Sequence, residues 1–409
     1  MVRCLILLFI AAAPLIAGEV HNDRQPKKPM TLVFEEDLRF GSSGDEDYLL
    51  WSSASITPDA NSKGDIFVTD PGGNRILQFD KNGVFLRQIG RQGEGPGEFQ
   101  ILSSFKLLGD GRGVAFDNQQ VSVTFSHFDK DMKYKDRKTL SSFGMVIQSA
   151  IFSNDARYVG AFYMVPNDEH TIQSFTGLLS AKDFKPVKVL TETTLERFKQ
   201  DKMEDPSWWS SYSAKWFAMV TQGVGVFAAG PNNTLFTAVS TKYEITKWDA
   251  DLKEMMVITR DYQPIARDMR ERKTLADPIR DELLSILPST LQDYMTPKVV
   301  DKGLELAEMR PVKPPIYWMY AMEDGGLVVI HKYDAVTGVS IADLFNPEGV
   351  YMGQAKLPPI KVNFFGSVFG NNTKMIFRNG FCYAIEETEN GTDLVRYRYQ
   401  WAPLNKKGS

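Results

Sequence analysis

The stretch GRQGEGPGEF, residues 90–99, holds four glycines and a proline in ten positions. A phosphate-binding loop needs such glycines between a strand and a helix whose N-terminal amides face the anion. Here Pro96 removes one amide, and the following FQILSSFKLL has the composition of a strand rather than a helix. We therefore interpret the stretch as a tight crossover between two β-sheet modules, without a role in phosphate binding.

A second stretch, DPSWWSSYSAKWF, brings together Trp208, Trp209, Tyr212 and Trp216. Flat aromatic rings on a loop can stack on sugar faces or anchor a protein partner. The alternative is that the rings fold back onto the rest of the chain and only seal the inserted segment. We take these four residues as candidate ligand-binding residues for an unidentified protein, peptide or carbohydrate.

Polar residues in TDPGGNRI could also resemble a site, but the stretch resembles NHL-like repeats, which implies a structural role. In such repeats the residues equivalent to Asp70 and Asn74 cap the turn between the second and third strands. The residue equivalent to Arg75 reaches a neighbouring carbonyl or carboxylate. We expect the three residues to hold the hairpin together.

The elements that must position these residues form a degenerate repeat. The clearest unit, DIFVTDPGGNRILQFDKNGVFLRQIG, has three runs of β-branched and aromatic residues separated by turn sequences. A fourth strand is expected before them, at about 49–56. The turn between first and second strands recurs near residues 60, 110, 155, 232, 325 and 379. This recurrence predicts six four-stranded units.

The last unit lacks its final strand, because the chain ends soon after LVRYRYQWAP. The segment TLVFEEDL, Thr31 to Leu38, has strand composition and can supply it. We therefore predict an all-β, six-bladed β-propeller closed by an N-terminal strand, an arrangement that leaves no long open sheet edge. The alternative, a β-sandwich followed by a helical domain, does not predict the recurring turns.

The predicted domain spans residues 30–405, with inserted segments at about 193–215 and 262–315. Within the second segment, Ile279, Leu283, Leu284 and Leu287 repeat at helical spacing after Asp277-Pro278. We expect a small helical insertion between blades four and five. It is interpreted as a cap over one end of the propeller rather than a separate catalytic domain.

Residues 1–18 have the organisation of a signal peptide: Arg3, an apolar run from Cys4 to Ile16, and small residues at the end. An uncleaved anchor is the alternative, because no clean A-x-A site is present. The run is too short to span a bilayer comfortably, so we expect no transmembrane span after cleavage and a periplasmic or extracellular location. Cys382 is then the only cysteine, which leaves no intramolecular disulfide.

Charge argues against a nucleic-acid partner. Removing the first eighteen residues leaves 46 basic residues against 51 acidic residues. This balance gives no general attraction to a phosphate backbone, so we expect no nucleic-acid binding.

At GDIFVTDPGGNRILQFDKNGVFLRQIGRQGEGPGEF the chain resembles the NHL-repeat proteins, and more closely the bacterial exported six-bladed β-propeller proteins with NHL-like blades. The match is specific over residues 64–99 and only a pattern elsewhere. The resemblance implies the six-bladed fold. It implies function poorly, since such propellers include ligand-binding modules, peptidyl-amidating lyases and RNA-binding regions.

Catalytic chemistry on a propeller generally uses residues from the innermost strands, and those predicted here are mostly apolar or small. We expect His21 in an N-terminal tail, and His127, His170 and His331 on second or third strands away from the axis. No GxSxG motif or EF-hand spacing occurs. We therefore predict no catalytic residue, no metal ligand and no cofactor, although the many Asp and Asn residues leave calcium open.

Together these features favour an exported, non-enzymatic β-propeller that binds a ligand or a protein at one end, with the two insertions forming the rim. The alternative is a metal-dependent propeller enzyme of the lyase or lactonase kind.

Overall fold

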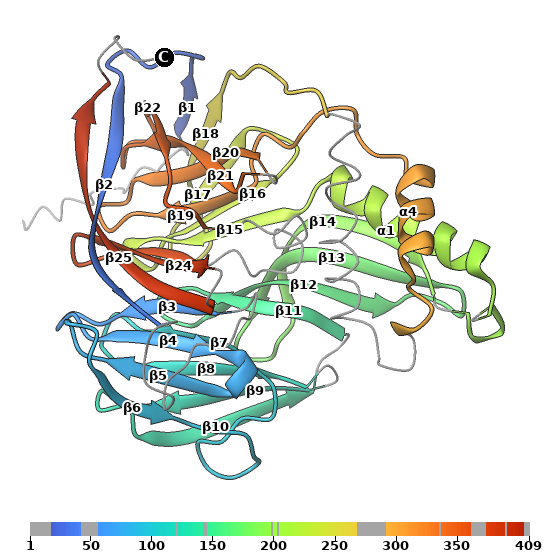
Figure 1. The fold of residues 1–409 in the computed structure, drawn as a ribbon, viewed down its shortest axis with the longest axis horizontal. Coiled ribbons are helices and arrows are strands. Elements are labelled where there is room, and N and C mark those ends of the chain that lie inside the picture. The colour runs from blue at the N-terminus through green and yellow to red at the C-terminus, as the bar shows by residue number, and fades with distance from the viewer. Residues whose placement is uncertain are drawn as a thin grey trace, which may run out of the picture.

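The computed structural model is mostly β, and its described residues form six sheets and two α-helices (Figure 1). It describes residues 18–41, 56–119, 122–141, 145–197, 199–202, 204–267, 292–334, 337–360, 374–388 and 391–404. Within these ranges no helix is long and apolar enough to cross a membrane. The predicted signal peptide, residues 1–18, lies outside the described residues except for Gly18, and the helical pattern at 279–287 lies outside them entirely.

The sheets are numbered one to six in chain order, and the strands of each are given from the innermost outward. Sheet one contains β3 (Thr57–Ala60), β4 (Ile66–Asp70), β5 (Arg75–Phe79) and β6 (Phe85–Ile89). Sheet two contains β7 (Leu102–Leu107), β8 (Gly113–Asn118), β9 (Ser122–Phe128) and β10 (Tyr134–Ser141). Sheet three contains β11 (Met145–Phe152), β12 (Tyr158–Pro166), β13 (Thr171–Ser180) and β14 (Pro186–Glu196).

Sheet four has five strands: β15 (Gly225–Ala229), β16 (Leu235–Val239), β17 (Glu244–Trp248), β18 (Glu254–Arg260) and β1 (Gly18–Asn22). Sheet five contains β19 (Trp318–Ala321), β20 (Leu327–Asp334), β21 (Val339–Phe345) and β22 (Tyr351–Lys356). Sheet six contains β23 (Met375–Arg378), β24 (Phe381–Thr388), β25 (Gly391–Pro403) and β2 (Met30–Phe40).

The innermost strands of the six sheets contact one another in chain order. β3 contacts β7, β7 contacts β11, and the series continues through β15 and β19 to β23. β23 in turn contacts β3. The sheets bury apolar side chains between them, as expected when both faces of each sheet are covered by neighbours. This arrangement is consistent with a six-bladed β-propeller.

The N-terminal segment runs along the outer strands of three sheets (Figure 1). β1 pairs in parallel with β18 of sheet four. The amide of Asn22 then donates to the carbonyl of Gly349 at 2.9 Å and accepts from the backbone N–H of Tyr351 at 2.7 Å, beside sheet five. β2 pairs antiparallel with β25. The predicted pairing of Thr31–Leu38 with the last sheet is confirmed, whereas β1 was expected to be a tail.

Ion pairs of Arg39 join β2 to the strands β24 and β25 of the same sheet. Its guanidinium lies 2.9 Å from the carboxylate of Glu386 and 3.1 Å from that of Asp393, and both acids are buried. An unpaired buried carboxylate lowers the stability of the folded state. The pairing of Glu386 and Asp393 with Arg39 therefore stabilises β2 in its position beside β25.

The innermost strand of sheet one differs from the prediction. It was expected at about 49–56, but residues 42–55 lie outside the described part of the chain, and the structure places Thr57–Ala60 in β3. The predicted turn near residue 60 included Pro58–Ala60, whereas the turn in the structure begins at Asn61. The physical reason is Asp59, which remains in a strand because its carboxylate accepts the backbone N–H of Ala60 at 2.9 Å and of Leu107 at 3.0 Å.

The TDPGGNRI hairpin has the predicted structural role. Asp70 lies 2.8 Å from the guanidinium of Arg75 and caps the short 3₁₀ turn Pro71–Gly73. Asn74 adopts the left-handed conformation and its side-chain oxygen accepts the backbone N–H of Leu102. The hairpin is therefore also joined to sheet two.

Residues 90–99 connect sheet one to sheet two, as predicted. Gly90 has φ +74° and lies against Phe99, so a Cβ at this position would come within 2.1 Å of the phenyl ring. The Glu98 carboxylate accepts the backbone N–H of Gly95 at 2.8 Å. These contacts explain the glycines by close packing, without any anion.

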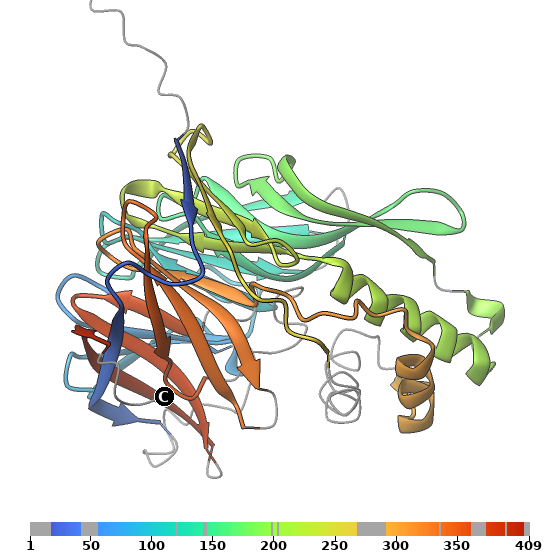
Figure 2. The same cartoon turned by 90° about the horizontal axis from the view of Figure 1, so that it is seen from above.

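The two α-helices lie side by side at one edge of the molecule (Figures 1 and 2). α1 (Pro206–Gln222) begins at Asp205, whose carboxylate caps the first turn, and α4 (Pro297–Leu306) begins at Thr296. Gly303 allows their close approach, because a Cβ there would lie 2.1 Å from Oγ of Ser213.

Candidate functional site

A cavity of about 100 Å³ lies between the innermost strands β3, β7, β15, β19 and β23. Its lining residues come from the C-terminal halves of most of these strands, close to the turns that lead to the second strands. We call it the central cavity. At this size it has room for several water molecules or one small anionic group, whereas a drug-sized ligand needs about 300 Å³ or more.

Three charged side chains from three different sheets meet at the central cavity. Nζ of Lys106 lies 3.6 Å from Oδ2 of Asp59, and Nε of Arg378 lies 3.8 Å from Oδ1 of the same carboxylate. The side chains are 14%, 6% and 24% exposed for Lys106, Asp59 and Arg378 respectively. Two cations therefore share one anion, and the cluster carries a net charge of +1 when Lys106 is protonated.

Asp59 has limited capacity to neutralise both cations. Its two carboxylate oxygens already accept backbone N–H groups from Ala60 and Leu107. Both distances to the cations exceed the range of a good hydrogen bond. An additional anion in the cavity would offer Lys106 and Arg378 oxygen atoms at hydrogen-bonding distance, which Asp59 does not.

Burial, opposed by the Asp59 carboxylate and aided by the nearby Arg378 charge, lowers the pKa of Lys106 to about 8. The desolvated ammonium is therefore close to losing its proton near neutral pH. A bound anion would stabilise the protonated form, so anion binding and protonation of Lys106 are coupled.

Arg378 also contacts an amide that is not part of the cavity lining, and the wall itself adds aromatic groups. Nη2 of Arg378 lies 3.5 Å from Oδ1 of Asn154, whose amide nitrogen donates to the carbonyl of Gly230. Phe105 and Phe377 add buried apolar surface. The wall thus reduces the water available to the two cations, which strengthens their electrostatic interactions.

The predicted aromatic residues lie elsewhere, and the expectation that they occupy a loop is wrong. All four lie on helix α1, because Asp205 and Pro206 begin a helix there. Trp209 and Trp216 are buried, and Trp209 stacks on Tyr294 with a centroid distance of 5.7 Å. Trp208 and Tyr212 are half-buried and stack on each other at 4.9 Å. Ligand binding by these rings stays a prediction.

The helices and the central cavity lie at opposite ends of the innermost strands. α1 leads into the beginning of β15, and α4 precedes the beginning of β19. The cavity cations lie at the opposite, C-terminal ends of the innermost strands. The described parts of the two insertions therefore connect to the other end of these strands, and not to the rim of the cavity.

The histidines lie close to where they were expected. His127 is on β9, the third strand of its sheet, and His331 is on β20, a second strand. His170 lies in the turn between β12 and β13 rather than on a strand. His21 lies on β1 instead of a free tail. Burial lowers the pKa of His331, whose Nδ1 lies 2.8 Å from the carbonyl of Pro315.

Sequence reasoning missed the three charged residues of the central cavity. The innermost strands were predicted to be apolar or small, and each charge is a single exception in such a run: Asp59 in ITPDA, Lys106 in SSFKLL and Arg378 in MIFR. A signal was available, because the repeat aligns these positions near the end of the first strand in three units. A charge at a predicted core position was the indication of a site.

The six sheets around the central cavity are consistent with a six-bladed β-propeller. Residues 57–185 match the family model DUF5128, described as a 6-bladed beta-propeller. The predicted resemblance to proteins of this architecture is confirmed. No curated protein matches the chain.

Several solved structures have a similar fold. A member of the DUF4221 family from Bacteroides vulgatus is 10% identical with a TM-score of 0.50, covering 92% of this chain and 99% of its own. A protein from Bacteroides fragilis described as exported is 9% identical with a TM-score of 0.46, covering 95% and 100%. Virginiamycin B lyase from Staphylococcus aureus is 8% identical with a TM-score of 0.35, covering 90% and 99%. At these identities the likeness concerns the fold alone, and the two scores below 0.5 carry no argument.

Proposed function

We propose that the protein is an exported, non-enzymatic binding protein that captures the anionic end group of a small molecule or peptide in its central cavity. The observation that carries the proposal is the meeting of Lys106 and Arg378 around a single, already engaged carboxylate. A carboxylate, sulfate or phosphate group is the complementary chemistry.

The proposal includes a closed ring of six blades with a small helical insertion between blades four and five. The contact of β23 with β3 and the pairing of β2 with β25 support closure. α4, which precedes sheet five, supports the insertion. Closure matters for binding because it holds strands from distant parts of the sequence around one cavity.

Export is proposed from the organisation of residues 1–18, where an apolar run follows Arg3. The expected location is the periplasm or the extracellular space. Amino-terminal sequencing of the protein recovered from outside the cytoplasm tests this: a start near Glu19 supports cleavage, and retention of Met1 contradicts it.

Size decides which kind of anion the cavity can hold. A volume of about 100 Å³ accepts a carboxylate or a tetrahedral oxyanion but not a whole nucleotide or oligosaccharide. The remainder of a larger ligand would lie outside, over the turns that follow the innermost strands. We therefore expect affinity for small anions to be weak, and affinity for a longer molecule with the same end group to be higher.

Isothermal titration calorimetry with sulfate and with succinate tests the proposal. The wild type should bind one anion per chain, and Arg378→Met and Lys106→Met should each weaken binding at least tenfold. Arg112→Met is a matched control, because Arg112 is an exposed arginine paired with Asp110 in the equivalent turn of sheet two. Equal binding by the wild type and both cavity variants would refute the proposal.

A metal-dependent lyase or lactonase is the alternative function. In the described lining of the central cavity the carboxylate of Asp59 is flanked by two cations, which repel a metal ion at that position. This electrostatic environment favours anion binding over metal catalysis in the cavity.

Helix α1 carries the proposed second contact, for a protein, peptide or carbohydrate partner. Trp208 and Tyr212 are the two stacked rings of this helix that keep exposed surface. Trp208→Ala should weaken capture of such a partner and should cost less stability than Trp209→Ala.

A further inference from the structure

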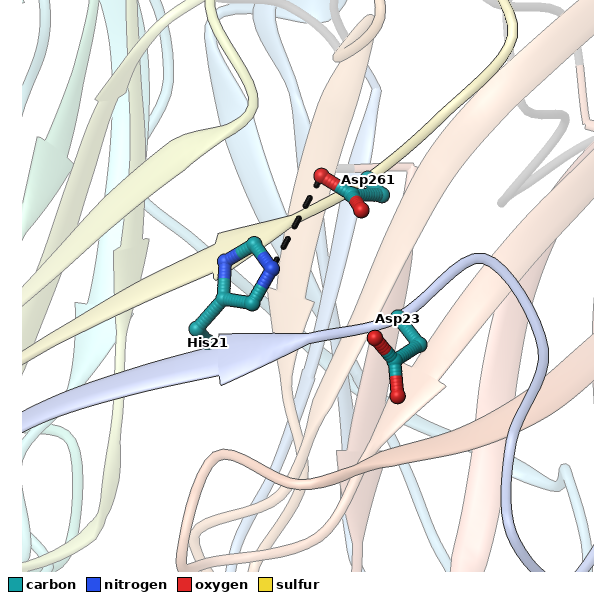
Figure 3. Close-up of side chains that lie close together, drawn as sticks. All are labelled: His21, Asp23 and Asp261. Atoms are coloured by element: carbon teal, nitrogen blue, oxygen red, sulfur yellow. Dashed lines mark ion pairs between the residues drawn. The ribbon is translucent and has the colours of Figure 1, made fainter.

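We propose that His21, Asp23 and Asp261 form a binding site for a divalent transition-metal ion of the zinc class at the outer edge of sheet four. One ligand atom from each residue lies within 4.8 Å of the others. Figure 3 shows the imidazole and the Asp261 carboxylate facing one another across the strand edge, with Asp23 next to them. This site is separate from the central cavity and does not depend on the proposed anion binding.

The backbone holds the three residues on two paired segments. His21 lies opposite Thr259 in the parallel pairing of β1 with β18. The pairing continues past the strand ends, because the backbone N–H of Asp261 donates to the carbonyl of Asn22 at 2.8 Å. Asp23 follows directly after β1. The positions of the Cα atoms are thus fixed by the sheet, and only the carboxylate rotamers need to adjust.

The imidazole of His21 is oriented as a metal ligand would be. Its Nδ1 lies 3.0 Å from Oγ1 of Thr259, which can accept the Nδ1–H proton. In that tautomer Nε2 carries the lone pair and faces the carboxylate. A hydrogen bond from the second ring nitrogen is the usual support for a metal-bound histidine.

The separation of the ligand atoms fits a bridging ion better than a direct bond. Nε2 of His21 and Oδ1 of Asp261 are 3.7 Å apart, which is too far for a hydrogen bond. Two ligands of a tetrahedral Zn²⁺, each about 2.1 Å from the metal, are separated by about 3.4 Å. A modest side-chain rotation therefore brings both atoms to metal distance.

The charges and exposure define the kind of ion. One neutral imidazole and two carboxylates balance a divalent cation, and the mixed nitrogen and oxygen donors suit Zn²⁺ better than Ca²⁺, which prefers oxygen ligands. His21 and Asp261 are 57% and 61% exposed, so water can complete the coordination. The consequence of binding is structural: the ion joins the N-terminal strand to sheet four.

The test uses the purified chain without a histidine tag, stripped of metal with a chelator and titrated with Zn²⁺ by calorimetry. We expect one ion per chain and a rise in melting temperature of a few degrees at about hundredfold excess over Kd. His21→Ala and Asp261→Asn should each lower the affinity at least tenfold. Neither change removes a buried group, so both variants should fold.

His127→Ala is the matched control. His127 is also an exposed histidine on a strand and pairs with Asp136 at 2.7 Å. This variant should bind Zn²⁺ as the wild type does. The proposal is overturned if the wild type binds no zinc, if His21→Ala binds equally well, or if His127→Ala removes the binding.

Discussion

The pH dependence of anion binding follows from the burial of Lys106. With a pKa of about 8, the ammonium is about 90% protonated at pH 7 and about 10% protonated at pH 9. Only the protonated form attracts an anion, so the affinity of the central cavity should fall about tenfold between these values. This loss corresponds to about 1.4 kcal/mol. Arg378 stays charged throughout and retains the remaining affinity.

Succinate and sulfate are suitable ligands for this measurement, because their own charge does not change between pH 7 and pH 9. Calorimetric titrations at half-unit steps should show a decline that sets in near pH 8 and continues to pH 9. Binding should also take up protons on the alkaline side, since a bound anion raises the pKa of Lys106.

Lys106→Met provides the decisive comparison, because it removes the titrating group and leaves Arg378 in place. Its affinity should be weaker at pH 7 and unchanged from pH 7 to pH 9. The reasoning is refuted if the wild type binds equally well at both values, or if the methionine variant keeps the pH dependence.

Three further predictions concern residues outside the central cavity. Trp209→Ala should lower the free energy of unfolding by about 3–5 kcal/mol, because the ring is buried and stacks on Tyr294. Trp208→Ala should lower it by about 1–2 kcal/mol, because this ring is half-buried. Equal losses in urea denaturation would contradict the assigned packing. Arg39→Met should cost about 2–3 kcal/mol by leaving two buried carboxylates without their cation, and a loss below 1 kcal/mol would show that β2 is held by its backbone pairing alone. The pKa of His331 in the folded state lies below its unfolded value of about 6.5, so the unfolded chain binds more protons below pH 6.5 and the free energy of unfolding should fall as the pH drops below this value. His331→Gln should remove this pH dependence in urea titrations. An unchanged pH dependence would assign it to other groups.

The repeat could be recognised in the sequence because turns require particular residues. Asp70, Asn74 and the glycines of residues 90–99 have side chains or backbone conformations that few alternatives satisfy. The glycines located the crossover from sheet one to sheet two, and the recurring turns between first and second strands located most of the sheets. The strand β2 was predictable for a similar reason, since an incomplete last unit needed a partner.

The central cavity was harder to predict, because its residues are far apart in sequence. Asp59 looked like part of a polar turn, and only its bonds to the Ala60 and Leu107 amides show why it remains in a strand. Lys106 and Arg378 each occur once in an apolar run. Their meeting depends on the order of the sheets around the cavity, which local patterns do not contain.

For the aromatic residues the error was of another kind. A local cluster of rings suggested a binding loop, whereas the structure shows a helix whose packing accounts for the buried rings. Trp209 and Trp216 are separated by seven residues, two helical turns, and lie on the buried side of α1. A helical period was therefore present in the sequence, after an Asp-Pro start of the kind that begins a helix. His21 was assigned to a tail because GEVHN is too short and polar to predict a strand.

The most direct test of the central claim is a crystal structure of the protein soaked in selenate, with anomalous data collected at the selenium edge. Selenate resembles sulfate in charge and shape, and selenium identifies the anion by its own signal. The account predicts one strong peak in the central cavity, within hydrogen-bonding distance of Lys106 and Arg378, that is absent from crystals of Lys106→Met. A cavity without a peak in the wild type, or an equal peak in the variant, would contradict it.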